Sequence, residues 1–254
     1  MTSQGPGPRA ALVTGASYGI GAATAIGLAE DGFDVAITDL TTAPLAKTQA
    51  AIEALGKRCV ALALDLRDQA SIEAAVSDAG GQLDGLCVLV NNAGVPSPSK
   101  PALEITRVIW DAGIAVNLTG TFFMACEMGR YLIAAARPGA IISLASTHGA
   151  VGFPGTSPYG IAKAGISHMS RILAIEWAPH GIRVNAVAPG TTPTESRAPS
   201  LADPKRREVM QSRIPLKRFA DVSEVAGAIR FLASPQAAYI TGQTLMVDGG
   251  LTAY

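Results

Sequence analysis

Short apolar runs alternate with longer segments of helical periodicity along this chain. The first apolar run is AALVTG, residues 10–15, and a helix is predicted directly after it, over residues 19–32. Further strands are predicted at 34–40, 59–66, 86–94, 140–146, 182–190 and 244–250, and further helices at 44–56, 68–79, 105–135, 158–177 and 223–233. Nearly continuous apolar strands joined by helical crossovers predict a doubly wound α/β protein, in which helices cover both faces of one parallel sheet.

No long linker and no change in composition divides this series. We therefore expect a single domain over residues 9–254, preceded by a short flexible tail over residues 1–8. Periodicity is poor between residues 191 and 216, which are rich in Pro, Thr, Ser and charge and include a short helical stretch near residues 202–213. Since such sheets bind ligands at the carboxyl ends of their strands, this segment is predicted to be a substrate lid.

Composition and charge narrow the possible functions. With 48% hydrophobic and 16% charged residues among 254, the chain can bury a large core. A formal net charge of zero without a Lys/Arg-rich block argues against nucleic acid or a membrane surface as the partner. The cysteines, Cys59, Cys87 and Cys126, form no metal-binding or disulfide pattern, and the N-terminus lacks a signal-peptide pattern. We expect a metal-free cytoplasmic protein that acts on small molecules.

A glycine-rich turn follows the first predicted strand. The segment TGASYGIG, Thr14–Gly21, ends that strand and opens a helix. Glycines let the backbone turn tightly and approach a pyrophosphate, whose negative charge is favoured by the free amides at a helix start. An ordinary loop is the alternative, but the strand before the turn and the helix after it favour a dinucleotide site.

A carboxylate ends the next predicted strand. Asp39 follows Gly21 by 18 residues, where an acidic side chain can accept hydrogen bonds from the adenosine ribose hydroxyls. The same charge repels the extra phosphate of NADP, so NAD is the expected cofactor. A simple helix-capping role for Asp39 is the alternative, but it leaves the glycines unexplained.

A tyrosine and a lysine stand four residues apart in SPYGIAK, residues 157–163. On a helix Tyr159 and Lys163 share one face, so the phenol lies beside the ammonium. Pro158 suits a position near the helix start, where its missing amide costs little. Taken alone, these residues favour a surface contact on an amphipathic helix over chemistry.

Several motifs in order give this chain a resemblance to a known family. TGASYGIG, NNAG at Asn91–Gly94, the Tyr159–Lys163 pair, APG at Ala188–Gly190 and the ending YITGQTLMVDGG resemble the classical short-chain dehydrogenases/reductases from Arg9 onward. The chain is similar to the branch of 3-oxoacyl-carrier-protein reductases and sugar or alcohol dehydrogenases. The resemblance implies a Rossmann fold, an NAD-dependent interconversion of secondary alcohol and ketone, and a homotetramer.

The resemblance also implies a catalytic set. Tyr159 corresponds to the acid or base that exchanges a proton with the substrate oxygen, and Lys163 to the residue that lowers the phenol pKa from about 10 and holds the nicotinamide ribose. Ser146 corresponds to the serine that binds the substrate oxygen, and Asn117 to the asparagine that anchors a water on the proton path. The segment SLAS departs from the common NISS, which leaves Ser143 as a buried structural residue.

Further contacts are implied position by position. The NNAG glycine and its neighbours correspond to the ribose contacts, the LDL segment to the adenine contacts, and the threonines after APG to the carboxamide contacts. Tyr18 stands where many NADP-using relatives have Arg or Lys. The full implied cofactor set is Gly15, Ser17, Tyr18, Gly19, Ile20, Gly21, Asp39, Leu40, Asp65, Leu66, Asn92, Ala93, Gly94, Tyr159, Lys163, Pro189, Gly190, Thr192 and Thr194. Substrate contacts are expected from Ser146, His148, Phe153, Tyr159 and Thr191.

Two other functions remain open at this level. The first is an NADPH-dependent 3-oxoacyl-carrier-protein reductase, for which Lys205, Arg206 and Arg207 offer a basic lid surface, although Asp39 and Tyr18 oppose NADP. The second is a dinucleotide-binding sensor without catalysis, against which the complete catalytic set argues.

Overall fold

The computed structural model describes residues 7–253, and the first six residues of the predicted tail over 1–8 lie outside this range. Within it, seven parallel strands form one sheet in the order β3-β2-β1-β4-β5-β6-β7. The strands are β1 Ala10–Thr14, β2 Asp34–Asp39, β3 Cys59–Ala63, β4 Leu86–Asn91, β5 Gly139–Leu144, β6 Ile182–Pro189 and β7 Thr244–Val247. The predicted parallel sheet is confirmed.

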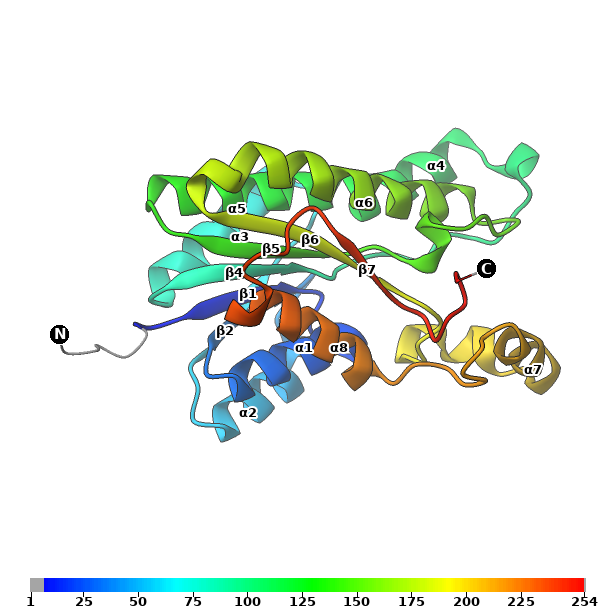
Figure 1. Cartoon of the computed structure of the whole chain (residues 1–254), viewed down its shortest axis with the longest axis horizontal. Helices are drawn as coiled ribbons and strands as arrows, with labels where there is room; N and C mark the ends of the chain where they lie inside the picture. The colour runs from blue at the N-terminus through cyan, green and yellow to red at the C-terminus, as the bar shows by residue number, and fades with distance from the viewer. Residues whose placement is uncertain (1–6, 254) are drawn as a thin grey trace.

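Helices cover both faces of the sheet, as predicted (Figure 1). On one face lie α1 Gly19–Glu30, α2 Ala46–Ala54 and α8 Val222–Ala233, and on the other lie α3 Gln69–Gln82, α4 Arg107–Ile114, α5 Thr121–Ala134 and α6 Ser157–Trp177. Helix α7, Pro204–Ser212, belongs to the segment predicted to be a lid and stands away from both layers in Figure 1.

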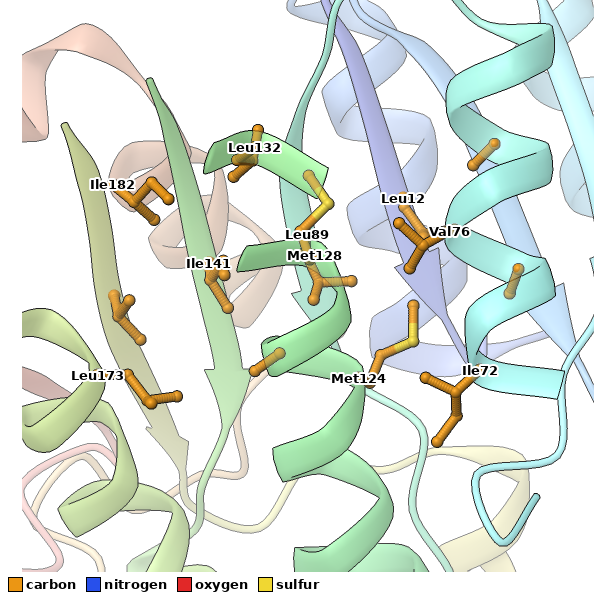
Figure 2. Close-up of a cluster of buried hydrophobic side chains, with 14 of the residues drawn as sticks. Leu12, Ile72, Val76, Leu89, Met124, Met128, Leu132, Ile141, Leu173 and Ile182 are labelled. Atoms are coloured by element: carbon orange, nitrogen blue, oxygen red, sulfur yellow. The ribbon is translucent and has the colours of Figure 1, made fainter. Parts of the chain in front are cut away.

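Two apolar layers hold the helices to the sheet. One lies between the sheet and α3, α5 and α6, where fully buried side chains such as Leu12, Leu89, Met124 and Ile141 meet (Figure 2). The other lies between the sheet and α1, α2 and α8. Burial of one such side chain contributes about 1.5–3 kcal/mol, so the layers fix the strand ends that carry the functional residues.

One predicted helix differs in the structure. The stretch predicted over 105–135 consists of α4, a π-helical segment Ala115–Gly120, and α5. Local bonds such as that from the Thr121 hydroxyl to the Val116 carbonyl, at 3.3 Å, accommodate the wider turn. By length and composition this stretch could cross a membrane, but its residues Met124, Met128 and Leu132 are fully buried in the core. Its apolar character therefore serves packing against the sheet.

The strand order places a crevice at one edge of the sheet. The order reverses between β1 and its neighbour β4, because the chain runs outward from β1 to β3 and then returns to the other side. In doubly wound sheets such a switch point leaves a crevice at the carboxyl ends of the strands, between helices on opposite faces. The residues after β1, β2, β4, β5 and β6 all meet at this edge.

Candidate active site

A large cavity lies at the carboxyl ends of the strands. Its volume is about 920 Å³, enough for a dinucleotide and a small substrate. All the residues predicted to contact cofactor line it: Gly15, Ser17, Tyr18, Gly19, Ile20, Gly21, Asp39, Leu40, Asp65, Leu66, Asn92, Ala93, Gly94, Tyr159, Lys163, Pro189, Gly190, Thr192 and Thr194. We call the part near the end of β2 the Asp39 end, and the part beside α6 the Tyr159 end.

The glycine-rich turn brings bare backbone to the cavity. Gly15 and Gly19 have φ of +66° and +61°, a region that side-chain-bearing residues rarely adopt. A Cβ on Gly21 would collide with the Gly15 carbonyl and lie 2.5 Å from the Asn92 amide nitrogen. Tyr18 precedes α1 without a side-chain capping bond, so the first amides of the helix are available to an anionic ligand.

Asn92 and Thr14 hold this turn in place. The Asn92 side-chain amide donates to the carbonyls of Thr14 and Gly15, at 3.0 and 2.8 Å. The Thr14 hydroxyl accepts from the backbone amides of Asn92 and Ala93, both at 3.0 Å. Sequence reasoning missed Thr14, although it belongs to the TGASYGIG motif. These bonds join the ends of β1 and β4 across the switch point.

The Asp39 end carries two carboxylates in different settings. Asp39 accepts hydrogen bonds from the Ser17 hydroxyl and from the backbone amide of Leu40. Asp65 instead forms an ion pair with Arg67, Nη2 to Oδ2 at 2.6 Å, which holds the pKa of the Asp65 carboxyl below its usual range. The predicted adenine contact of Asp65 therefore involves a side chain already engaged by Arg67. Sequence reasoning missed Arg67, because its contact with Asp65 depends on the shape of the turn after β3.

Lys163 lies almost wholly inside the protein at the Tyr159 end. It is 5% exposed, and its Nζ donates to the Leu144 carbonyl at 2.6 Å. Burial lowers the pKa of its ammonium to about 8, so the group remains largely protonated at pH 7. Its Nζ lies 5.8 Å from the centre of the Tyr159 ring, one helical turn earlier on α6. The predicted shared face of the two residues is observed.

The pKa of the Tyr159 phenol is shifted in the direction opposite to the expected one. Burial raises its pKa above the usual value, and the opposing effects of a hydrogen bond from Ser146 and the charge of Arg197 are weaker. The lowering expected from Lys163 is not seen, because the lysine ammonium is directed to the Leu144 carbonyl. The phenol of Tyr159 is therefore protonated at neutral pH.

The two candidate serines of β5 have separate roles. Ser143 is fully buried, and its hydroxyl accepts from the Asn91 side chain at 3.3 Å across the β4–β5 pair. Ser146 lines the cavity at the strand end, accepts the backbone amide of His148 at 3.2 Å and bonds to Tyr159. The geometry thus favours Ser146 for substrate contact and Ser143 for structure.

Asn117 lies in the π-helical segment and is fully buried. Its side chain accepts the Val95 amide at 3.0 Å and donates to the Val95 carbonyl at 2.9 Å. A Cβ on Gly94 would lie 2.8 Å from the Asn117 Oδ1 and 4.0 Å from the Lys163 Nζ. Asn117, Gly94 and Lys163 therefore meet beneath the Tyr159 end, and Asn117 fixes the backbone after β4.

The lid closes one wall of the cavity. The Thr194 methyl packs above the glycine turn, since a Cβ on Gly19 would lie 2.9 Å from it. Thr192 is 3% exposed, and its hydroxyl donates to the Gly190 carbonyl at 3.3 Å. Arg197 and Arg206 also line the cavity. The sequence named Arg206 only as part of a basic surface and did not single out Arg197, because nothing in the pattern of this segment distinguishes either residue from a solvated charge.

Some of the residues predicted to contact substrate line the cavity and others lie outside its lining. Ser146, His148 and Tyr159 line the cavity. Phe153 does not reach the wall, and its ring stacks on His148 with 4.3 Å between centroids. Thr191 also stands outside it, and its carbonyl accepts the Ala220 amide at 3.1 Å instead. Phe153 thus stacks on a residue of the cavity wall, Thr191 bonds to the segment before α8, and their contacts with substrate stay predictions.

The cavity fits a nicotinamide dinucleotide. The glycine turn with free helix amides suits a diphosphate, and Asp39 presents carboxylate oxygens where a ribose would lie. Ser146, Tyr159 and Lys163 line the same cavity at the Tyr159 end. Among residues 7–253, no cluster of three or more His, Cys, Asp or Glu side chains is placed to hold a metal ion.

Known proteins share this fold and these motifs over almost the whole chain. A family model described as enoyl-(acyl carrier protein) reductase, one of those of the short-chain dehydrogenases/reductases, matches residues 15–252. The chain is 42% identical to cis-4-hydroxycyclohexanecarboxylate dehydrogenase of Sinomonas cyclohexanicum over 245 residues, 96% of this chain and 97% of that relative.

Solved structures of similar proteins have the same fold. A protein described as a short-chain alcohol dehydrogenase, from Sinorhizobium meliloti 1021, superposes with a TM-score of 0.93 at 44% identity, covering 96% of each chain. One described as a 2-deoxy-D-gluconate 3-dehydrogenase, from Agrobacterium tumefaciens and with NADP bound, gives 0.90 at 36% identity over 97% of each chain. The chain belongs to the short-chain dehydrogenase/reductase family, whose members are oxidoreductases that use nicotinamide dinucleotides on alcohol and ketone groups.

Burial of Lys163 predicts a specific pH dependence of stability. The pKa is about 8 in the folded chain against 10.5 as the ordinary value, so the unfolded chain holds more protons between these limits. Stability of the wild type relative to Lys163→Met should therefore rise from pH 8 to 10.5, by up to about 3 kcal/mol, and be flat below pH 8. Urea unfolding of both proteins at each pH measures this difference.

The matched control is Lys47→Met, at an exposed position of α2, for which the difference should stay nearly constant with pH. If the free energies of unfolding of wild type and Lys163→Met change in parallel with pH, the prediction is contradicted, because the Lys163 ammonium would then have the same pKa in the folded and the unfolded chain.

Proposed function

We propose that this protein is an NAD-dependent oxidoreductase that interconverts a secondary alcohol and a ketone, with Ser146, Tyr159, Lys163 and Asn117 as its catalytic set. The observation that carries the proposal is that one cavity is lined both by a dinucleotide-type glycine turn and by Ser146, Tyr159 and the buried Lys163, whose Nζ lies 5.8 Å from the centre of the Tyr159 ring. A bound nicotinamide ring supplies the hydride acceptor or donor.

Ser146 and Tyr159 act on the substrate oxygen. Both hydroxyls line the cavity, and both can hydrogen-bond one carbonyl oxygen placed between them. During reduction the negative charge that develops on that oxygen is neutralised by the phenol proton, and during oxidation the phenolate accepts the proton of the alcohol. The raised pKa of Tyr159 keeps the proton in place until an oxyanion develops beside it.

Lys163 and Asn117 support this proton transfer. The Lys163 ammonium is buried, so its charge acts through a poorly screened environment on any phenolate that forms at Tyr159. Asn117 positions the backbone of Val95 and lies against Gly94, and thereby shapes the floor beneath the lysine. The resemblance gives Asn117 a water-anchoring role, and its burial beside Lys163 supports that assignment.

Charge at the Asp39 end supports NAD as the cofactor. Asp39 lies at the end of β2 with Tyr18 rather than a cation on the turn above it. Arg67 also lines the cavity, but it is ion-paired with Asp65, so its charge is already compensated. A phosphate on the ribose 2′ position would face uncompensated carboxylate charge.

We also infer a homotetramer located in the cytoplasm. Apolar side chains remain exposed on α5 and α6, among them Phe122, Phe123, Ile172 and Ile175, which supports association through this helical face. The three cysteines are unpaired, as is usual in a reducing compartment.

Replacing Tyr159 tests catalysis. Tyr159→Phe should lower kcat for secondary-alcohol oxidation by about 10³-fold, because the proton acceptor is lost, while the Kd for NADH stays within a few-fold. The assay follows absorbance at 340 nm with cyclohexanols, hydroxycyclohexanecarboxylates, polyols and hydroxyacyl esters. Tyr239→Phe, at a fully exposed tyrosine, serves as the control. Cofactor binding without turnover of any substrate by the wild type would favour a sensor.

Replacing Asp39 tests the cofactor. Asp39→Ser should lower the ratio of kcat/KM with NAD to kcat/KM with NADP by about 10- to 100-fold, since the repulsion of the 2′-phosphate is removed. The control Asp78→Ser removes an exposed charge of α3 and should leave the ratio unchanged. A wild type that prefers NADP would support the 3-oxoacyl-carrier-protein reductase alternative.

A further inference from the structure

His148 packs against both Ser146 and Tyr159. Its ring lines the cavity and meets the Tyr159 ring nearly at right angles, at 82°, with 5.6 Å between the centroids. Its Nδ1 lies 3.4 Å from the Ser146 Oγ. The same ring stacks on Phe153, with 4.3 Å between the centroids. Contacts with two aromatic rings therefore hold the imidazole next to the Ser146 hydroxyl.

The turn that carries this imidazole, Thr147–Gly149, packs closely on α6. A Cβ on Gly149 would lie 2.6 Å from the backbone carbonyl carbon of Lys163, and a Cβ on Gly160 would lie 2.9 Å from the His148 carbonyl oxygen. Backbones approach this closely because both positions are glycine. Backbone packing therefore fixes the place of the imidazole beside the two hydroxyls.

The hydroxyl of Ser146 has one proton to donate and two lone pairs that accept. The backbone amide of His148 donates to one lone pair, at 3.2 Å. The Nδ1 of the same residue either donates to the second lone pair or accepts the serine proton, depending on the tautomer of the ring. If Nδ1 accepts, Ser146 has no proton left for the cavity. If Nδ1 donates, the serine proton points away from the turn.

The surroundings of the serine favour an imidazole that donates from Nδ1. Burial and, to a lesser degree, the charge of Arg197 lower the pKa of the His148 ring, so at neutral pH it carries a single N–H. Burial also raises the pKa of the Tyr159 phenol, and a hydrogen bond from Ser146 acts against it, which requires the serine to donate to the phenolate. A substrate oxygen that becomes negative also needs a donor at this place.

We propose that His148 is a positioning residue, whose Nδ1–H donates to the Ser146 Oγ and thereby directs the serine proton to the substrate oxygen. This inference rests on the proposed function of Ser146 and adds a residue that acts through it. With both lone pairs engaged by His148, the hydroxyl can act towards a ligand only as a donor. The donor is oriented before the substrate binds, so the transition state does not have to order it.

Two substitutions separate hydrogen bonding from ring packing. His148→Phe keeps a ring to stack on Phe153 but removes the donor, whereas His148→Asn removes the ring and places an amide donor near the position of Nδ1. We expect kcat to fall about 10- to 100-fold in His148→Phe and less than about threefold in His148→Asn. The reverse order would show a packing role and overturn the proposal. The control His180→Phe, at an exposed histidine, should leave kcat unchanged.

A Ser146→Ala background shows whether His148 acts through the serine. In this background His148→Phe should lower kcat less than about twofold further, because the oxygen that the imidazole positions is gone. If the two losses multiply instead, His148 acts independently of Ser146 and the proposal is wrong.

The tautomer can be measured without any turnover, which separates this inference from the proposed function. The chain has three histidines, so ¹⁵N labelling of their rings and long-range ¹H–¹⁵N correlation, with His148→Asn for assignment, identify the protonated nitrogen of His148. At about pH 8, where an imidazole is neutral, Nδ1 should carry the proton. A proton on Nε2 would overturn the inference and leave the oxidoreductase proposal intact. Failure of the proposed function would be seen separately, as cofactor binding without turnover by the wild type.

Discussion

The buried ammonium of Lys163 is the constraint on which the rest of the site depends. Taking a charged group out of water costs several kcal/mol, which the bond to the Leu144 carbonyl offsets only in part. The folded chain retains this unfavourable group because α6 is held firmly against β5 and β6, and because Gly94 leaves space above the Asn117 side chain. Stability is thereby reduced at the one position where an unscreened positive charge is useful to chemistry.

The parallel sheet places the functional residues together at one edge. Parallel strands deliver the glycine turn, Asp39, Asn92, Ser146 and Pro189 to the same edge, so one elongated cavity joins a dinucleotide site to a proton-transfer site. An elongated ligand bound at the glycine turn can therefore reach the proton-transfer groups without leaving the cavity.

Local patterns predicted the fold and the backbone-encoded part of the site. Strand and helix periodicity, the glycine turn and the spacing of Tyr159 and Lys163 are properties of short segments, and the structure reproduces them. Contacts that depend on the folded chain were not accessible: the ion pair of Asp65 with Arg67 depends on the turn after β3, and Thr194 packs over Gly19 from a distant segment. The surroundings of Phe153 and Thr191 were not foreseen either, since their neighbours are fixed by the packing of the loop before α6 and of the segment after β6.

The measurement that tests the account most directly is the pH dependence of kcat/KM in both directions. If Tyr159 is the proton-transfer group, oxidation requires its phenolate and should accelerate with pH from 6 to 8, approaching about tenfold per pH unit, and level off above the Lys163 pKa of about 8, where the stabilising ammonium is lost. Reduction requires the phenol and should be flat or fall over the same range. Oxidation that is independent of pH over this range, with chemistry shown to be rate-limiting by a primary deuterium isotope effect, would contradict the assignment of Tyr159.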